Sequence, residues 1–180
     1  MSGNLFNEKE LQQAVEKYHL SNDIILKAKN IFINFGKENL SNEETQQAPY
    51  LMQFFGEVLG YIHNTQEKSL WWESGSKVDG KKPDGILGFN VTNYRECDED
   101  MRGAGDIRVV IELKDDKKPL DKPQNRVKDN RTPVEQAFSY ASKVGGKCEW
   151  VIVSNFRKTR LYRFGDESKY HEFDLEELAN

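Results

Sequence analysis

Two carboxylates and a lysine occupy positions where neighbouring β-strands would bring them together. Residues 107–114, IRVVIELK, are rich in branched apolar side chains and indicate a strand with Glu112 and Lys114 on one face. Asp84 opens the preceding apolar segment, so pairing of the two strands would put its carboxylate beside Glu112. With the carbonyl oxygen of Leu113, the two carboxylates form an all-oxygen set that suits Mg²⁺, with Mn²⁺ as a substitute.

Metal-assisted hydrolysis of a phosphodiester is the chemistry that this set predicts. A bound metal ion polarises a phosphoryl oxygen and lowers the pKa of a bound water. Lys114 would orient the attacking water or neutralise charge that develops near it. No histidine is needed, because the metal supplies the activated nucleophile. Val109, Ile111 and Leu113, on the other face of the strand, are expected in the core.

The pattern Pro83-Asp84, 27 intervening residues and Glu112-Leu113-Lys114 resembles the motif of the PD-(D/E)XK nuclease superfamily. The resemblance implies a restriction-endonuclease-like fold and Mg²⁺-dependent DNA cleavage. It also implies a metal-binding role for Glu57, which is similar to the acidic residue that the first core helix often contributes. Gln136 and Tyr140 resemble the QxxxY element of the RecB-like and restriction branches. Being four residues apart, they would share one helix face and could contact a phosphate or the catalytic lysine.

Residues 50–175 look more specifically like the N-terminal nuclease domain of fused restriction–modification enzymes of the type IIG kind. This resemblance implies double-stranded DNA as substrate and a homodimer on DNA for cutting both strands. It also implies a methyltransferase and a target-recognition region, in the same longer chain or in a partner chain. Two alternatives stay open: the nuclease part of a type I restriction motor subunit, and a non-catalytic DNA- or protein-binding module with the same fold.

Basic residues are concentrated in the middle of the chain, although the net charge is −4. Residues 76–164 contain 19 Lys and Arg against 14 Asp and Glu, a net of +5. A nucleic-acid surface depends on local potential rather than on total charge. A loop is expected at 115–131, and its cations either contact the DNA backbone or simply keep an exposed loop hydrated. They are Lys117, Lys118, Lys122, Arg126, Lys128 and Arg131.

Helices are expected in the first third of the chain. Leu11, Val15 and Tyr18 indicate one, and a second would run from Ser21 to Gly36. A third is expected from Pro49 to His63, with a buried face made by Leu51, Phe54, Phe55, Val58, Leu59 and Ile62.

Strands follow, interrupted by one helix with a clear start. Thr132-Pro133-Val134-Glu135 is a capping box, and the helix that it starts would end near Val144. The strands are expected at 84–91, 107–114, 149–154 and 159–164. This order predicts an α/β fold in which helices flank a central mixed β-sheet. The expected parts are an N-terminal helical extension (1–45), a nuclease core (46–175) and the start of a connector helix (176–180).

Several other functional classes are disfavoured. The two cysteines, Cys97 and Cys148, are too few to form a disulfide framework and are not spaced like metal ligands. The three histidines are isolated in the sequence. No apolar run approaches the roughly 18 residues that a membrane span needs. With no signal peptide at the start, a cytoplasmic location is expected. Trp71-Trp72 could stack on a nucleotide, but packing is the more ordinary role for such a pair.

Overall fold

The computed structural model describes residues 3–36, 43–63, 68–72, 82–92, 105–124, 129–144 and 147–179. In these residues, eight strands form one mixed sheet in the order β1-β8-β7-β6-β5-β4-β3-β2. Along the chain the elements are β1 (Gly3–Asn4), α1 (Glu8–Lys17), α2 (Asn22–Gly36), α3 (Glu43–Tyr50), the π-helical segment η1 (Leu51–Val58), β2 (Ile62–His63), β3 (Lys68–Trp72), β4 (Gly85–Phe89), β5 (Asp106–Leu113), α4 (Pro133–Ala141), β6 (Trp150–Ser154), β7 (Lys158–Arg163), β8 (Lys169–Asp174) and α5 (Leu175–Ala179). The predicted α/β class with a mixed sheet is confirmed.

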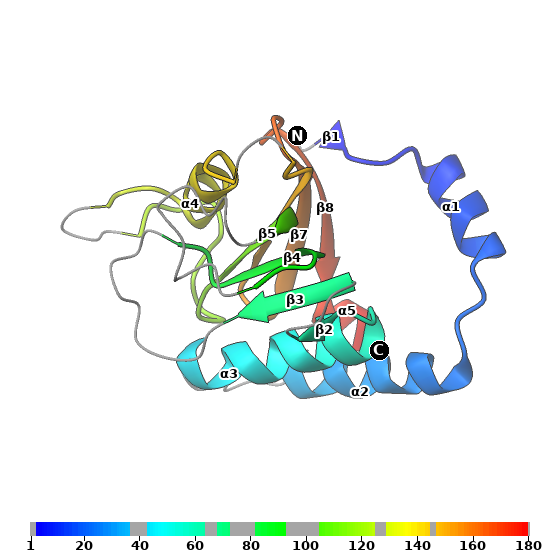
Figure 1. Ribbon diagram of the computed structural model, residues 1–180. Helices are drawn as coiled ribbons and strands as arrows, with labels where there is room; N and C mark the ends of the chain where they lie inside the picture. Colours follow the sequence, from blue (N-terminus) through cyan, green and yellow to red (C-terminus); the bar gives the residue numbers. More distant parts are fainter. Residues whose placement is uncertain are drawn as a thin grey trace.

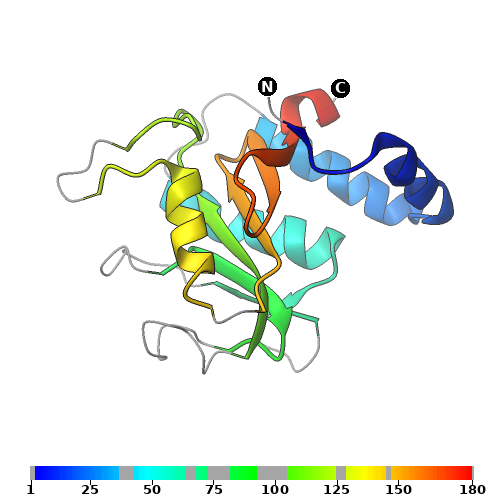
Figure 2. The same cartoon turned by 90° about the horizontal axis from the view of Figure 1, so that it is seen from above.

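Helices cover both faces of this sheet. Figure 1 shows α4 on one side and α2, α3 and α5 on the other, and the view from above in Figure 2 looks onto α4. Each face of the sheet has its own hydrophobic cluster. Val110 packs in the cluster between the sheet and α4, whereas Val109, Ile111 and Leu113 pack in the cluster between the sheet and α2, α3 and η1. The predicted alternation of β5 is therefore confirmed. Because helices cover both faces, the face with Val110 is shielded from water as the opposite face is.

The helix α2 belongs to the core rather than standing apart from it. Ile31 and Phe35, from the range expected to be an N-terminal extension, are 4% and 3% exposed. The Phe35 ring meets Tyr50 edge to face at 5.2 Å and stacks on Phe156 at 6.1 Å. Residues before position 46 thus complete the layer that supports one face of the sheet.

The third helix differs from its prediction in start, end and pitch. It begins at Glu43, so that Pro49 lies inside α3 instead of in a first turn, and it continues as η1 only to Val58. Proline lacks the N–H that an α-helix needs, which gives a physical reason for the change of pitch that follows it. Gly60, with φ of +72°, lies just beyond the end of the helix. Leu59 and Ile62, expected on the buried face, are instead 40% and 60% exposed.

Strand β3 and strand β8 were not expected from the sequence. β3 pairs antiparallel with β4, and β8 pairs antiparallel with β7. Phe173 and Asp174 end β8, and α5 starts at Leu175, one residue before the range expected for the connector helix. The alternation in KYHEFD is weak because β8 has no fully buried side chain to mark its inner face.

The predicted start of α4 is present in full. The hydroxyl of Thr132 accepts a hydrogen bond from the N–H of Glu135 at 3.1 Å, and the Glu135 carboxylate accepts one from the N–H of Thr132 at 2.7 Å. Thr132→Ala should lower the free energy of unfolding by about 1 kcal/mol, because the N–H of Glu135 loses the hydroxyl oxygen that accepts its hydrogen bond. Urea unfolding measures this, with Ser139→Ala in the same helix as a control that should change it by less than about 0.5 kcal/mol. Equal effects of the two substitutions would contradict the capping role.

Candidate functional site

Asp84 lies next to the end of β5, as the pairing of its strand requires. Gly85 of β4 is the register partner of Ile111. The N–H of Asp84 donates to the Ile111 carbonyl at 3.1 Å, and its carboxylate oxygen Oδ2 accepts from the Leu113 N–H at 2.7 Å. Gln47 of α3 donates to the Asp84 carbonyl at 3.0 Å. Both the backbone and the carboxylate of Asp84 are thus held against β5.

Glu112 and Lys114 form a fully buried ion pair on the α4 face of the sheet. Their side chains are 1% and 0% exposed, and the Lys114 ammonium donates to the carboxylate oxygen Oε1 of Glu112. The same ammonium donates to the Leu113 carbonyl at 3.0 Å. Two of the oxygens expected to bind a metal ion therefore already converge on one cation.

Such an ion pair is poorly explained by stability alone. Moving two charges out of water costs several kcal/mol per ion, and apolar replacements of similar volume are often neutral or stabilising. The Lys114 N–H donates to the Ser154 carbonyl at 2.8 Å, which aligns the end of β5 with β6. The protein thus holds two opposite charges in a fixed, dry position at the end of a central strand.

Gln136 and Tyr140 share one face of α4, and the sequence pattern had predicted this. The Gln136 side-chain amide donates to the Tyr140 hydroxyl at 2.7 Å, and both residues are buried. Gln124, from the loop before α4, donates to the Gln136 side-chain carbonyl at 2.6 Å. Gln124 was missed by sequence reasoning, because a glutamine in a polar loop carries no signal.

The electrostatic surroundings link Tyr140 to the carboxylates. Burial, followed by the negative charge of Glu112, raises the pKa of the Tyr140 hydroxyl well above its usual range, and Asp84 contributes in the same direction. Tyr140 is therefore a neutral hydroxyl at all physiological pH values. It can donate or accept a hydrogen bond beside this acidic group without adding a charge.

Asp129 holds the Arg131 side chain near Glu112 and Tyr140. Its guanidinium donates twice to the Asp129 carboxylate, at 2.8 Å and 2.6 Å, and the hydrogen bond with Asp129 is the main cause that raises the pKa of Arg131. The negative charge of Glu112 raises that pKa further. Arg131 was expected only as one of several loop cations, and its side chain is 38% exposed.

Three of the other predicted loop cations lie at the surface of the described loop. Lys117, Lys118 and Lys122 are exposed, and Lys118 forms an ion pair with Asp115 at 3.3 Å. Arg126 and Lys128 lie outside the described residues.

The loop after β5 is anchored by the hairpin between β6 and β7. The Asn155 amide donates to the carbonyls of Asp116 and Lys118 at 3.3 Å and 3.0 Å. Arg160 binds Asp121 through two hydrogen bonds of 2.5 Å and 3.0 Å and Glu172 through a third of 2.6 Å. The guanidinium of Arg160 therefore acts as a clamp on the loop rather than as a free phosphate contact.

Removing the Arg160 clamp should destabilise the fold. Arg160→Met leaves two carboxylates without their main partner, so the free energy of unfolding should fall by about 1.5–3 kcal/mol. Urea unfolding measures the loss. Lys158→Met is the matched control, since Lys158 also binds Glu172 but is 48% exposed, and it should cost less than about 1 kcal/mol. A loss for Arg160→Met no larger than for Lys158→Met would contradict the clamp.

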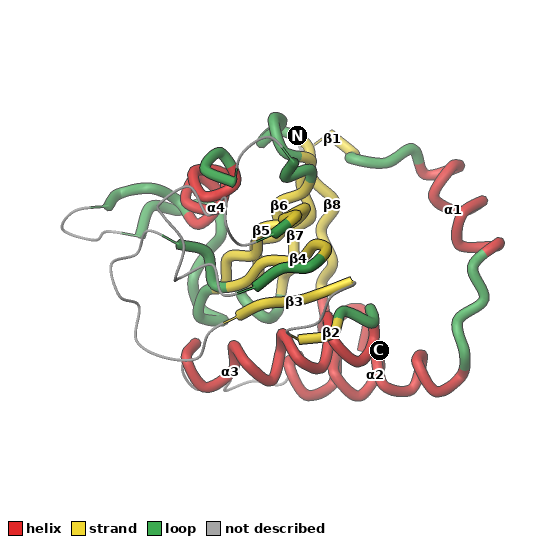
Figure 3. The backbone as a smooth tube through the Cα atoms, in the orientation of Figure 1, coloured by secondary structure: helices red, strands yellow, loops and turns green. Residues whose placement is uncertain are grey.

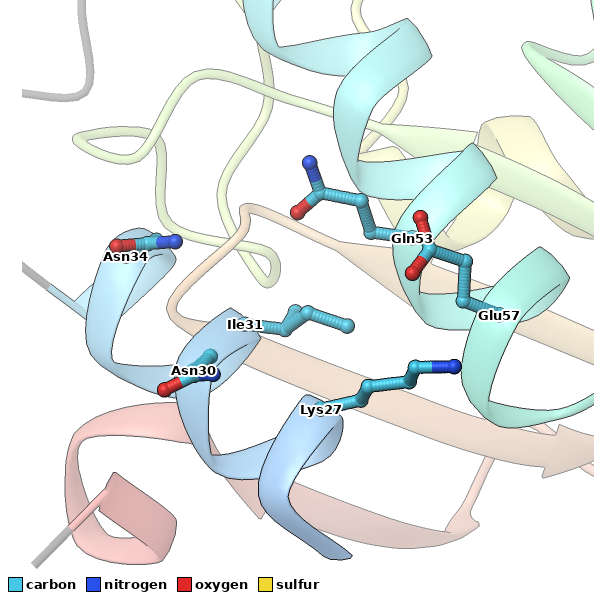
Figure 4. Close-up of a pocket in the computed structure, with 6 residues that line it drawn as sticks. All are labelled: Lys27, Asn30, Ile31, Asn34, Gln53 and Glu57. Carbon is cyan, nitrogen blue, oxygen red and sulfur yellow. The ribbon is translucent and has the colours of Figure 1, made fainter. Parts of the chain in front are cut away.

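Glu57 does not lie with Asp84, Glu112 and Lys114. It lies on η1 and lines a shallow pocket against α2 with Lys27, Asn30, Ile31, Asn34 and Gln53 (Figure 4). Its negative charge contributes to raising the pKa of Lys27, after the larger effect of Asp23. Within the described part of the chain, no set of three or more His, Cys, Asp or Glu is arranged to hold a metal ion. A metal site here would therefore rest on two carboxylates and a carbonyl.

Trp71 and Cys148, two further residues considered in the sequence analysis, both take part in packing. Trp71 packs against the cluster under α4, and its ring stacks on His63 at 5.0 Å. Cys148 is a buried free thiol, and burial raises its pKa to about 11, which makes it a poor nucleophile at neutral pH. Cys97 and the side chain of Trp72 lie outside the described residues.

Comparisons place no known protein beside this chain. No protein-family model, no curated protein and no solved structure matches it. Among the described helices, none is both long and apolar enough to cross a membrane.

Proposed function

We propose that this chain is a metal-dependent nuclease that hydrolyses phosphodiester bonds of double-stranded DNA, with a PD-(D/E)XK restriction-endonuclease-like form of the α/β fold. One observation carries the proposal. The buried Lys114 ammonium bridges the Glu112 carboxylate and the Leu113 carbonyl, and the Asp84 carboxylate is hydrogen-bonded to the N–H of that same Leu113. An acidic pair with a lysine in this arrangement is the set that metal-assisted hydrolysis needs.

The residues fit a hard divalent cation. Carboxylate and carbonyl oxygens are the ligands that Mg²⁺ prefers, and two of the three proposed oxygens already bind a cation in the form of the Lys114 ammonium. Asp84, Glu112 and the Leu113 carbonyl would hold Mg²⁺ or Mn²⁺. When bound there, the ion supplies Lewis-acid polarisation of a phosphoryl oxygen and a water of lowered pKa.

The side chains around the oxygens have separate tasks in this proposal. Lys114 keeps a positive charge against the reacting phosphate, where it can donate to the attacking water or to a phosphoryl oxygen. Gln136 and Tyr140 orient each other, and the neutral Tyr140 hydroxyl can donate to the same phosphate or support Lys114. Arg131, held by Asp129, offers the planar guanidinium that suits phosphate.

Binding of the DNA backbone would use the surface around the site. Lys117, Lys118 and Lys122 are exposed on the loop that the Asn155 and Arg160 contacts anchor. Each phosphate neutralised by such a cation steepens the fall of affinity with salt concentration. The choice of DNA sequence would come from elsewhere in a restriction–modification system, where a methyltransferase and a target-recognition region act with this nuclease in the cytoplasm.

Cleavage of supercoiled plasmid tests the proposal. The protein is incubated at high concentration with plasmid and Mg²⁺, Mn²⁺ or a chelator. Nicked and linear DNA should form with either metal and not with the chelator. Cleavage that continues undiminished in the chelator would overturn a metal-dependent mechanism. A shift of DNA mobility without cleavage under any metal would instead favour a non-catalytic binding module.

A further inference from the structure

Three polar side chains form a hydrogen-bond relay that leads from the loop before α4 toward the proposed site. The side-chain amide of Gln124 donates to the side-chain carbonyl of Gln136 at 2.6 Å. The Gln136 amide donates in turn to the Tyr140 hydroxyl at 2.7 Å. Gln136 and Tyr140 are 2% and 1% exposed, so water does not compete for these bonds. The proposed function gives tasks to Gln136 and Tyr140 but none to Gln124.

Both hydrogen bonds of this relay run in the same direction. An amide side chain has its donor on one side and its acceptor on the other. The nitrogen that Gln124 offers therefore fixes the Gln136 amide with its own nitrogen toward Tyr140. A hydroxyl that accepts from Gln136 directs its proton away from Gln136. The relay thus leaves the Tyr140 hydroxyl able to donate to another group.

The relay would run the opposite way if both amides were turned over. Gln136 would then donate to Gln124, and Tyr140 would donate to the Gln136 carbonyl. The side-chain oxygen of Gln124 is buried without a hydrogen-bond partner among the described residues, so turning its amide only exchanges one unpaired polar group for another. The Tyr140 end therefore decides between the two orientations. Burial, and after it the negative charges of Glu112 and Asp84, raises the pKa of Tyr140, and these charges attract its proton.

The backbone holds Gln124 where its side chain can start the relay. The Gln124 N–H donates to the Arg131 carbonyl at 3.3 Å. Figure 3 shows, in green, the loop segments that this bond joins, next to the helix α4. Helix α4 starts at Pro133, two residues after Arg131. Gln124 is thus tied both to the segment that enters α4 and to a buried side chain of that helix.

We propose that Gln124 is a positioning residue, which acts through Gln136 to direct the Tyr140 proton toward the site of phosphodiester hydrolysis. This role rests on the proposed function, whereas the direction of the relay can be measured without cleavage. A donor that is already oriented stabilises charge developing on a reacting phosphate without having to reorganise first. The effect of Gln124 passes through Gln136 and Tyr140 rather than through contact with the reacting atoms.

Two substitutions of Gln124 separate positioning from simple anchoring. A glutamate there is ionised at neutral pH and only accepts, so Gln136 would turn its nitrogen toward it and Tyr140 would donate to the Gln136 carbonyl. Gln124→Glu should therefore slow metal-dependent plasmid cleavage by about tenfold or more, and by more than Gln124→Met does. A residue that only anchors the loop would give the opposite order, because glutamate can still accept a hydrogen bond from Gln136.

Gln12→Glu is the matched control, because it makes the same change of charge on the exposed helix α1 and should leave the cleavage rate unchanged. Tyr140→Phe shows whether the effect passes through the hydroxyl. In that background Gln124→Glu should change the rate by less than about twofold, since no hydroxyl proton is left to direct. The full loss in that background, or a loss in Gln124→Met as large as in Gln124→Glu, would overturn the positioning role.

Raman spectroscopy measures the direction of the hydroxyl without DNA or metal. The intensity ratio of the tyrosine doublet distinguishes a hydroxyl that accepts a hydrogen bond from one that donates it. Subtracting the spectrum of Tyr140→Phe isolates Tyr140 among the seven tyrosines. We expect an accepting hydroxyl in the natural protein and a donating one in Gln124→Glu, with circular dichroism confirming that both are folded. The same signal in both would overturn the relay even if the protein cleaves DNA. The expected change of signal in a protein that does not cleave would support the relay and overturn only the proposed function.

Discussion

Glu112→Gln is expected to reduce the rate of metal-dependent plasmid cleavage by about 10²–10³-fold or more. The substitution keeps the size of the side chain but removes the negative charge that holds the Lys114 ammonium and that would hold the metal ion. The loss should appear in the rate at saturating metal, because the charge acts on the reacting phosphate. Gel analysis of nicked and linear plasmid over time measures the rate.

A fold defect must be separated from a catalytic one. Glu112→Gln leaves a buried ammonium without its counter-ion, which by itself can destabilise the protein. Asp84→Asn is the second variant, because its side-chain carbonyl can still accept the hydrogen bond from the Leu113 N–H. It should lose activity to a similar extent while unfolding at nearly the same temperature as the natural protein.

Glu149→Gln provides the matched control for these two variants. Glu149 precedes β6, is 54% exposed and pairs with Arg108 at 2.6 Å, far from any role in the proposed chemistry. Its substitution should leave the cleavage rate unchanged within about twofold, as expected for an exposed ion pair. Cleavage that survives in Asp84→Asn and Glu112→Gln at the level of this control would remove the assigned site.

Phe55→Ala is expected to cost about 3–5 kcal/mol of the free energy of unfolding. Phe55 is 1% exposed and meets Tyr50 edge to face at 6.0 Å and Phe54 at 5.1 Å. Truncation would leave a cavity between η1 and the sheet, in the cluster that contains Ile111 and Leu113. Urea unfolding followed by circular dichroism measures the loss.

Met52→Ala, in the same π-helical segment, tests whether the effect comes from burial. Met52 is 52% exposed, so its truncation should change the free energy of unfolding by less than about 0.5 kcal/mol. Similar costs for Phe55→Ala and Met52→Ala would contradict the packing described for η1. A large loss at Phe55 alone would support the role of this helical layer in holding the β5 face opposite the site.

The central strand and the start of α4 could be predicted because their signals are local. The alternation of residues 107–114 defines which side chains share a face, and the spacing of Gln136 and Tyr140 defines a helix face. Both follow from backbone geometry and are unaffected by what packs above them. The capping box at Thr132 is similarly a contact within four residues.

Features that depend on distant parts of the chain could not be predicted in this way. Gln124 reaches Gln136 across a loop, and Arg160 reaches Asp121 from another hairpin. The position of Glu57 was inferred from a resemblance, but η1 turns this side chain toward α2. Apolar spacing indicated the helix α1, but no residue of that helix is buried, because spacing alone does not define what packs against a helix.

Mn²⁺ binding tests the central claim most directly, because it needs neither DNA nor turnover. Electron paramagnetic resonance follows free Mn²⁺ during titration of the natural protein, Asp84→Asn and Glu57→Gln. We predict a site in the natural protein whose affinity falls about tenfold or more in Asp84→Asn and stays unchanged in Glu57→Gln, since Glu57 lies against α2. Equal affinity of the natural protein and Asp84→Asn would contradict a metal site built from Asp84, Glu112 and the Leu113 carbonyl.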